Sequence, residues 1–236
     1  MAGMAVETAV DQATEAAMAA DHGRVALVAG ATGLVGREIL AALLADKTYT
    51  QVHCVGRRVL ALKHPKLTSH VVDFNALASL PKADDCFIAL GTTIKVAGGK
   101  DAFRAIDLKA VEAVALAAKA SGATKLGVIS AMGANSHSSV FYNRIKGEME
   151  LSVARMGFKN LVIARPSLID GDREALHQPG RAGESLGLML ARGLSPLLPA
   201  NYRAIKATDI AHALIRQVKA GTPGVVTLMS GEMQGG

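Results

Sequence analysis

The chain has 236 residues, 50% hydrophobic and 19% charged, so it can form a sizeable core, and a wholly disordered chain is excluded. Its five Phe, three Tyr and absence of Trp argue against a protein that reads nucleic acids by stacking bases on exposed rings. The net charge of +6 attracts anions, but no Lys/Arg run is longer than Arg57-Arg58, which favours a small phosphorylated molecule over a nucleic acid as partner.

The hydropathy pattern predicts neither a membrane protein nor a secreted one. The apolar stretches are broken by charged residues or glycines before they reach the ~20 residues that a bilayer span requires. No basic segment followed by an apolar one opens the chain. Cys54 and Cys86 lie in apolar, strand-like runs, as buried free thiols in a reducing compartment would. We therefore expect a cytoplasmic protein with no membrane insertion and no nucleic-acid partner.

In chain order, residues 1–22 come first as an Ala-rich, acidic extension without Lys or Arg, which forms either a peripheral helix or a flexible arm. Residues 23–236 then alternate short apolar runs with helical patterns, as expected of one domain. Strands are expected at 25–29, 52–56, 69–73, 86–90, 125–130, 161–165 and 225–229, and helices at 34–45, 101–120, 139–156 and 208–220, the last with Thr208 as its N-cap.

Near-continuous apolar strands separated by helices are typical of a parallel sheet covered on both faces. The sequence therefore predicts an α/β fold: a single doubly wound Rossmann domain with a mostly parallel seven-stranded sheet.

A glycine-rich loop, Gly30-Ala31-Thr32-Gly33-Leu34-Val35-Gly36, joins the first expected strand to the first helix. Glycines here let the chain turn sharply and let backbone amides approach a pyrophosphate at the positive end of the helix. A structural turn without a ligand is the alternative. Because the loop opens the first strand–helix unit of an alternating chain, it predicts a dinucleotide site.

Arg57 and Arg58 follow the second expected strand, where NAD-binding proteins carry an acidic residue for the ribose 2′-hydroxyl. Two guanidinium groups suit a 2′-phosphate instead, so NADP(H) is favoured as the cofactor, although a solvated basic turn is an alternative. Asp73, which ends the third expected strand, could accept from the adenine amino group or start a turn.

Three residues could carry the chemistry. Tyr142 and Lys146 are spaced i, i+4, so a helix places them on one face, and Ser130 ends a neighbouring strand. An ammonium beside a phenol favours the phenolate, and such a tyrosine can exchange a proton with a substrate oxygen while hydride moves at carbon. Ser130 could orient that oxygen. A solvated helix face is the alternative for Tyr142 and Lys146. No Cys/His/Asp spacing predicts a metal site.

Together these features resemble the short-chain dehydrogenase/reductase superfamily over nearly all of residues 24–230. More narrowly, the chain looks like the Tat-interacting-protein-like oxidoreductases, an atypical branch close to the nucleoside-diphosphate-sugar epimerase-like proteins. The motifs that carry this likeness are Leu90-Gly91-Thr92-Thr93, the Val-Gly-Arg-Arg strand end, Val72-Asp73-Phe74, Tyr142 through Glu148 and Arg165-Pro166-Ser167.

The resemblance implies a residue-by-residue cofactor site. Gly30, Thr32, Gly33, Leu34 and Val35 would line the pyrophosphate, Arg57 and Arg58 the 2′-phosphate, Asp73 and Phe74 the adenine, Leu90, Gly91 and Thr92 the ribose and nicotinamide, and Pro166 and Ser167 the carboxamide. Ser130, Tyr142 and Lys146 would be catalytic, the last two also touching the cofactor. The G-x-x-G-x-x-G spacing departs from simple alcohol dehydrogenases, and only the segment at about 170–204 is left to cover a substrate.

We therefore expect an NADP(H)-dependent oxidoreductase that acts on a small carbonyl or alcohol, as a monomer or homodimer. Two alternatives stay open. An NADPH-binding sensor or regulatory protein would keep the cofactor site with little catalysis. An epimerase or dehydratase with tightly held nicotinamide would use the same residues.

Overall fold

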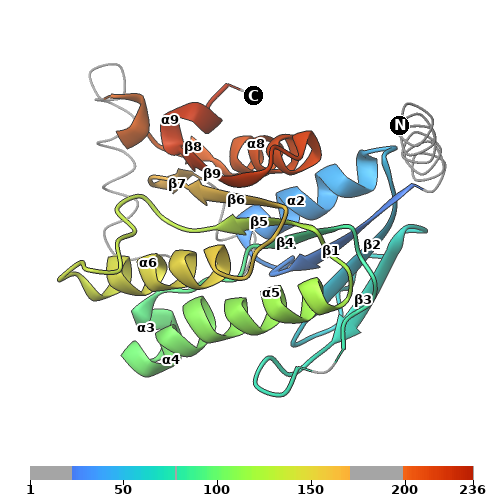
Figure 1. Cartoon of the computed structure of the whole chain (residues 1–236), viewed down its shortest axis with the longest axis horizontal. Coiled ribbons are helices and arrows are strands. Elements are labelled where there is room, and N and C mark those ends of the chain that lie inside the picture. Colours follow the sequence, from blue (N-terminus) through green and yellow to red (C-terminus); the bar gives the residue numbers. More distant parts are fainter. Residues whose placement is uncertain (1–22, 78, 171–198, 236) are drawn as a thin grey trace, which may run out of the picture.

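The computed structural model describes residues 23–77, 79–170 and 199–235. Its main feature is a sheet of seven parallel strands in the order β3-β2-β1-β4-β5-β6-β9 (Figure 1). The strands are β1 (Arg24–Ala29), β2 (Tyr49–Gly56), β3 (Leu67–Val71), β4 (Asp85–Ile88), β5 (Lys125–Ile129), β6 (Asn160–Arg165) and β9 (Gly224–Met229). The predicted doubly wound α/β fold is confirmed.

Helices cover both faces of the sheet (Figure 1). Helices α2 (Leu34–Ala45) and α8 (Ala207–Ala220) pack on one face around Ile39, Leu43 and Leu214. On the other face lie α4 (Lys100–Arg104), a π-helical turn η1 (Ala105–Ala110), α5 (Val111–Ala120) and α6 (Phe141–Ala154), which share a core with Val114 and Met149. The central strands are therefore buried on both sides, which explains their unbroken apolar sequences.

Three short helical elements and a second, two-stranded sheet were not anticipated from the sequence. They are α3 (Ile94–Ala97), the 3-10 turn η3 (Ala200–Tyr202), α9 (Ser230–Met233) and the strands β7 (Ile169–Asp170) and β8 (Ile205–Lys206), which pair in parallel. Each is too short to show a hydrophobic period. The predicted extension at 1–22, and residues 171–198 of the predicted covering segment, lie outside the described residues.

Two sequence predictions were wrong in detail. Thr208 is not the N-cap of α8: the helix begins at Ala207, because β8 leads straight into it with Lys206 at the cap position. The helix expected at 101–120 is interrupted, because η1 forms a wider turn between α4 and α5. A π turn adds one residue to the helical ladder, and a 3.6-residue period carries no sign of it.

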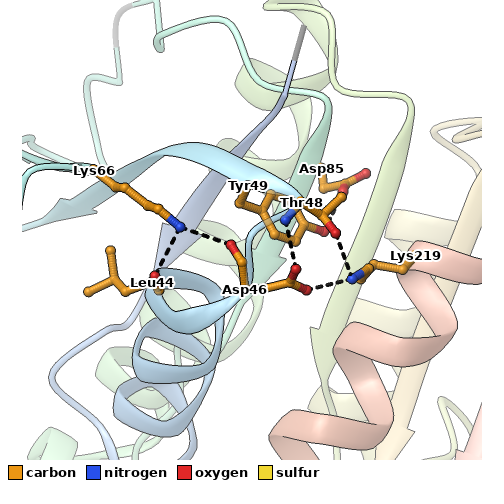
Figure 2. A network of polar contacts seen from close by, with 7 residues as sticks. All are labelled: Leu44, Asp46, Thr48, Tyr49, Lys66, Asp85 and Lys219. Atoms are coloured by element: carbon orange, nitrogen blue, oxygen red, sulfur yellow. Dashed lines mark hydrogen bonds and ion pairs between the residues drawn. The ribbon is translucent and has the colours of Figure 1, made fainter. Parts of the chain in front are cut away.

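A polar network ties the helices to the edge of the sheet where the strands begin (Figure 2). Asp46, which follows α2, accepts hydrogen bonds from Lys219 of α8 at 2.5 Å and from the Thr48 amide at 2.8 Å. Lys66 donates to the carbonyl oxygens of Leu44 and Asp46. These contacts join chain segments up to 173 positions apart, and so fix α2 and α8 side by side.

Candidate active site

A cavity of about 550 Å³ opens at the edge where the strands end. From β1 the chain builds β2 and β3 on one side and then crosses to β4 on the other, so the strand order reverses between β1 and β4. In doubly wound sheets, ligands bind in the crevice at this reversal. Residues just after β1, β2 and β4 line the cavity, together with the turn 105–110.

The three glycines of the loop lack a side chain for different structural reasons. Gly30 has φ 90°, and a Cβ there would lie 2.5 Å from the Ala89 carbonyl oxygen. A Cβ on Gly36 would lie 2.0 Å from the Gly30 oxygen. Both glycines are thus required by the packing of the chain on itself. Gly33 lines the cavity, and a Cβ there would meet only ordinary contacts, so its missing side chain leaves room for a ligand.

The amino end of α2 meets the cavity at Gly33, its N-cap. No side chain caps this end and its first turn has no acidic residue, so backbone amides and the positive end of the helix dipole are available to an anion. The side chain of Val35 is buried in the core and that of Leu34 packs against the core, so these two residues can offer only their backbone to a ligand.

Ten of the predicted cofactor residues line the cavity. They are Gly30, Thr32, Gly33, Arg57, Arg58, Asp73, Phe74, Leu90, Gly91 and Thr92. Arg57 and Arg58 are exposed at the end of β2. The Asp73 carboxylate accepts from the backbone amide of Asn75 at 2.9 Å, so it does start a turn, while it also lies on the cavity wall.

Lys146 lies immediately behind the cavity wall. Its Nζ is 2.8 Å from Asp107 Oδ1, and both side chains are buried. A Cβ built on Gly91, a lining residue, would lie 3.8 Å from the same Nζ. Burial would lower the pKa of Lys146, but the electrostatic attraction of the Asp107 carboxylate, with a smaller contribution from Tyr142, outweighs it, so the pKa is raised.

Ser130 belongs to a second buried polar group. Its hydroxyl donates to Glu150, which lies one helical turn after Lys146 on α6. The guanidinium of Arg165 donates to both oxygens of the same carboxylate, at 3.0 and 2.5 Å. The hydrogen bonds to Glu150 raise the pKa of Arg165. Ser130 is thus held in a fixed orientation by a charged acceptor.

Tyr142 packs its ring against Phe103, with ring centroids 5.4 Å apart. Within the described part of the chain its hydroxyl has no hydrogen-bond partner, and Tyr142 does not line the described cavity wall. Pro166 and Ser167 do not reach the described cavity wall: the Pro166 carbonyl accepts from Met132, and the Ser167 hydroxyl lies 2.8 Å from that of Ser230.

Asp107, Glu150 and Arg165 are the polar residues that sequence reasoning missed at this site. Glu150 follows Lys146 at the i+4 spacing that places both on one face of α6, which is a usable signal. Arg165 belongs to the Arg165-Pro166-Ser167 motif but was given no role there. No sequence pattern singles out Asp107, because the 3.6-residue hydrophobic period of a helix does not reveal the π turn that buries it.

Two kinds of feature are not found in residues 23–77, 79–170 and 199–235. No group of three or more His, Cys, Asp or Glu side chains is placed to hold a metal ion. No helix there has both the length and the apolar character needed to cross a bilayer.

Solved structures share this fold at low sequence identity. MoeE5 in complex with UDP-glucose and NAD superposes with a TM-score of 0.65 over 87% of this chain and 75% of its own, at 17% identity. A short chain dehydrogenase family protein from Francisella tularensis gives 0.64 over 89% and 99%, at 14% identity. At such identities the likeness shows the fold alone.

Sequence relatives are more informative. Protein HTATIP2 of Rattus norvegicus is 32% identical over 214 residues, which cover 88% of this chain and 83% of that protein. "Protein FMP52, mitochondrial" of Candida glabrata is 35% identical over 158 residues, 65% of this chain and 67% of the relative. An Aspergillus fumigatus protein named "fmp52, mitochondrial" is 39% identical over 160 residues.

These relatives correct the expected location. The expectation of a cytoplasmic protein is wrong, because several of the most similar relatives are named mitochondrial. The sequence argument rested on missing signals and on two cysteines that are indeed buried and free. Reduced thiols occur in any reducing compartment, so they could not single out the cytoplasm.

A family match agrees with the cavity and the glycine loop. Residues 30–175, more than half of the chain, match the family described as NAD(P)H-binding. The loop, the cavity-lining ends of β1, β2 and β4, and α6 with Tyr142 and Lys146 all fall inside this range. The predicted resemblance is confirmed: the chain belongs to the NAD(P)H-binding family of Rossmann-fold proteins and is a homologue of HTATIP2 and FMP52.

Proposed function

We propose that the protein is an NADP(H)-dependent oxidoreductase that interconverts a small carbonyl compound and its alcohol. One observation carries the proposal: the ammonium of Lys146 lies directly behind Gly91 on the wall of the cavity, on the helix that also carries Tyr142. The reacting end of a dinucleotide bound along the cavity would therefore lie close to this positive charge, on the helix that also carries the proposed proton donor.

NADP(H) is proposed over NAD(H) on the charges of the cavity. A 2′-phosphate at the end of β2 would lie beside the exposed guanidiniums of Arg57 and Arg58, which can bind phosphate through two hydrogen bonds each. The pyrophosphate would lie at Gly33 and the uncapped end of α2. Asp73 lines the same cavity, and its carboxylate accepts a hydrogen bond from the Asn75 amide.

The roles of the three residues follow from their positions. Reduced nicotinamide, when bound, supplies a hydride to the substrate carbon. Tyr142 gives a proton to the substrate oxygen in reduction and takes it back in oxidation. Lys146 holds a positive charge close to that hydroxyl. Ser130, whose proton is donated to Glu150, offers its lone pairs and thereby orients the group that it meets.

Cofactor binding is tested by titrating the purified protein with NADPH and with NADH and following nicotinamide fluorescence. We expect NADPH to bind more tightly, and the double variant Arg57→Ala/Arg58→Ala to lose that preference. Arg216→Ala is the matched control, because Arg216 is exposed on α8 and does not line the cavity. Equal binding of both nucleotides by the parent protein would reject the NADP(H) proposal.

Catalysis is tested separately with a panel of small carbonyl substrates. Tyr142→Phe removes the proton donor and keeps the ring that packs on Phe103, so it should bind NADPH normally and lose turnover. A loss of about 100-fold or more is expected from removing a general acid. Full turnover by Tyr142→Phe would rule out this mechanism.

A second candidate is an NADPH-binding regulatory protein with little catalysis. It is favoured by one observation: none of Ser130, Tyr142 and Lys146 lines the described cavity wall, and Ser130 and Lys146 are each bonded to a buried carboxylate instead. Tight NADPH binding by the parent protein, with no turnover across the panel and a partner captured only in the presence of NADPH, would favour this candidate over the first.

A further inference from the structure

The pair Asp107–Lys146 joins two parts of the molecule that the proposed function needs together. Asp107 comes from the π turn η1, Lys146 from α6, and their charged atoms are 2.8 Å apart with both side chains buried. The second carboxylate oxygen of Asp107 accepts a hydrogen bond from the Thr92 amide at 2.9 Å, on the cavity wall. We propose that Asp107 is a positioning residue, which keeps Lys146 charged and links it to the cofactor edge at Thr92.

The local backbone explains how an acid reaches this position. In an uninterrupted helix over 101–120, the residues on one face would recur every 3.6 positions. The turn Ala105–Ala110 is wider, and Asp107 within it is completely buried against α6. Burying an acid is costly unless a partner is present, and π turns cluster at functional sites. The turn therefore serves to bring a carboxylate to Lys146.

The charges that face Lys146 come from two elements. Asp107 lies on η1, and Tyr142 and Glu150 lie on α6 itself. The carboxylate of Glu150 already accepts two hydrogen bonds from the guanidinium of Arg165. Of these two carboxylates, Asp107 is the one that forms an ion pair with Lys146, at 2.8 Å. Without it, burial would be the dominant influence on the ammonium and would favour its neutral form.

This inference rests on the proposed function for its consequence. A neutral Lys146 would no longer place a positive charge beside Tyr142. The Thr92 contact would also pass any movement of the cavity wall directly to the acid that holds Lys146. Asp107 touches neither the substrate nor the cofactor in this account, and acts only through Lys146 and Thr92.

The test is the pH dependence of thermal unfolding, which needs no turnover. Asp107→Asn keeps the shape and the acceptor for Thr92 but removes the charge. The pKa of Lys146 should then fall below its unfolded-state value, so the unfolded chain binds more protons than the folded one. Stability must therefore rise with pH: the Tm of Asp107→Asn should increase between about pH 7 and 10.

The double variant Asp107→Asn/Lys146→Met is the reference, because it lacks the titrating amine and leaves no unpaired buried charge. Its Tm should not rise over the same range, so the difference between the two variants isolates Lys146. Glu112→Gln is the matched control: Glu112 forms an exposed ion pair with Lys109, at 2.8 Å, on the neighbouring helix. It should follow the parent protein at every pH.

Each outcome decides the proposal. The role of Asp107 in keeping Lys146 charged is supported if Tm rises with pH in Asp107→Asn but not in the double variant. It is supported too if Asp107→Asn folds only at high pH. If Asp107→Asn is unfolded throughout while the double variant folds, the unpaired ammonium is the cause, which supports it too. Identical pH dependence in both variants, or two unfolded variants, would overturn it, since Asp107 would then be needed for folding alone.

Turnover gives a second readout that separates this inference from the proposed function. In Asp107→Asn, kcat for carbonyl reduction should decline with rising pH from a lower pH than in the parent or in Glu112→Gln. A parent protein without turnover would reject the proposed oxidoreductase and leave the unfolding experiment valid. An active Asp107→Asn enzyme with the pH profile of the parent would overturn the role given to Asp107.

Discussion

The two edges of the sheet both bury a carboxylate beside a cation, with different results. Where the strands begin, Asp85 accepts from the Tyr49 hydroxyl at 2.6 Å and pairs with Arg24, so each of its oxygens is hydrogen-bonded. Where the strands end, Asp107 Oδ1 is within ion-pair distance of Lys146 but lacks the angles of a hydrogen bond. A buried ion pair is thus common to both edges; the Asp107–Lys146 pair differs in that it lies behind the cavity wall at Gly91 and leaves one carboxylate oxygen without a hydrogen bond among the described residues.

The tyrosines show the same contrast. Tyr49 is fully buried, and burial together with Asp85 raises its pKa far above the ordinary value, so it stays a phenol and serves as a permanent donor. Tyr142 is only partly buried, and its hydroxyl has no partner within the described residues. At the edge where the strands begin, the tyrosine hydroxyl is thus bonded to an acid of another strand, while at the other edge the Tyr142 hydroxyl has no such bond within the described residues.

The largest expected effect is on the edge where the strands begin. Asp85→Ala would leave the Tyr49 hydroxyl and the Arg24 guanidinium without their acceptor, and should lower the free energy of unfolding by about 3 kcal/mol, a value reduced because Arg24 can reach solvent. Chemical denaturation measures this loss. Asp84→Ala, at the exposed neighbouring acid, is the control and should cost less than half as much.

NADPH affinity should be unchanged in folded Asp85→Ala, since this acid lies at the opposite edge from the cavity. A large loss of NADPH affinity in a folded sample would contradict the view that this edge serves stability and the opposite edge serves binding.

Within the glycine loop, the fold and the ligand can be separated by two matched substitutions. Gly36→Ala places a Cβ 2.0 Å from a backbone oxygen and should destabilise the protein by about 3 kcal/mol or slightly less. Gly33→Ala meets only ordinary contacts, so Tm should hardly change, while NADPH binding should weaken by about tenfold, or 1.4 kcal/mol. Unaltered binding by Gly33→Ala would mean that the cavity floor is not where the dinucleotide lies.

Glu150→Gln should affect catalysis more than folding. It keeps the shape of the side chain but weakens the acceptor that holds Ser130, so kcat should fall about tenfold with little change in KM. Glu148→Gln, two positions away on α6, breaks a comparable but more exposed pair with Arg104 and should leave kcat unchanged. Equal kcat values for the two variants would show that Ser130 needs no such support.

The sequence predicted the regular elements of the fold, the strands from apolar runs and the helices from a repeating hydrophobic period. All seven strands of the main sheet and the bounds of α2 follow from runs and periods, since a buried parallel strand must be apolar along its length. Departures occur where tertiary contacts decide: β2 begins at Tyr49, before its apolar run, because that ring is buried beside Asp85. The π turn at Ala105–Ala110 is a departure of the same kind.

The sequence predicted those site residues whose positions follow from the ends of the strands. It missed those whose positions depend on a side-chain partner far away in the sequence. The glycine loop and the arginines after β2 lie on the cavity wall as expected, because their positions follow from the strand ends. Ser167 and Pro166 do not reach the described cavity wall: contacts with Ser230 and Met132, distant in sequence, engage them instead. Asp107 and Glu150 were missed because a buried acid is recognised by its partner, which only the folded chain supplies.

The smallest effect is expected at the partly exposed ion pair between Asp46 and Lys219, drawn in Figure 2. Burial alone would raise the pKa of Asp46, but hydrogen bonds from Lys219 and Thr48 outweigh it and lower the pKa. Lys219→Met should cost only about 0.5 kcal/mol at pH 7, because both partners reach solvent. A carboxyl whose folded pKa is depressed stabilises the protein above its unfolded pKa and loses that contribution as pH falls through the folded value.

The cost of Lys219→Met should therefore shrink as pH falls from 7 to about 2, because Asp46 is protonated as pH falls through its lowered folded pKa. Urea denaturation of the parent and Lys219→Met at both pH values measures it, with Lys159→Met as a control for the loss of an exposed lysine. A cost that persists undiminished at low pH would mean that the aliphatic stem of Lys219, packed between α2 and α8, does the stabilising. The network would then belong to the apolar core rather than to the charged edge.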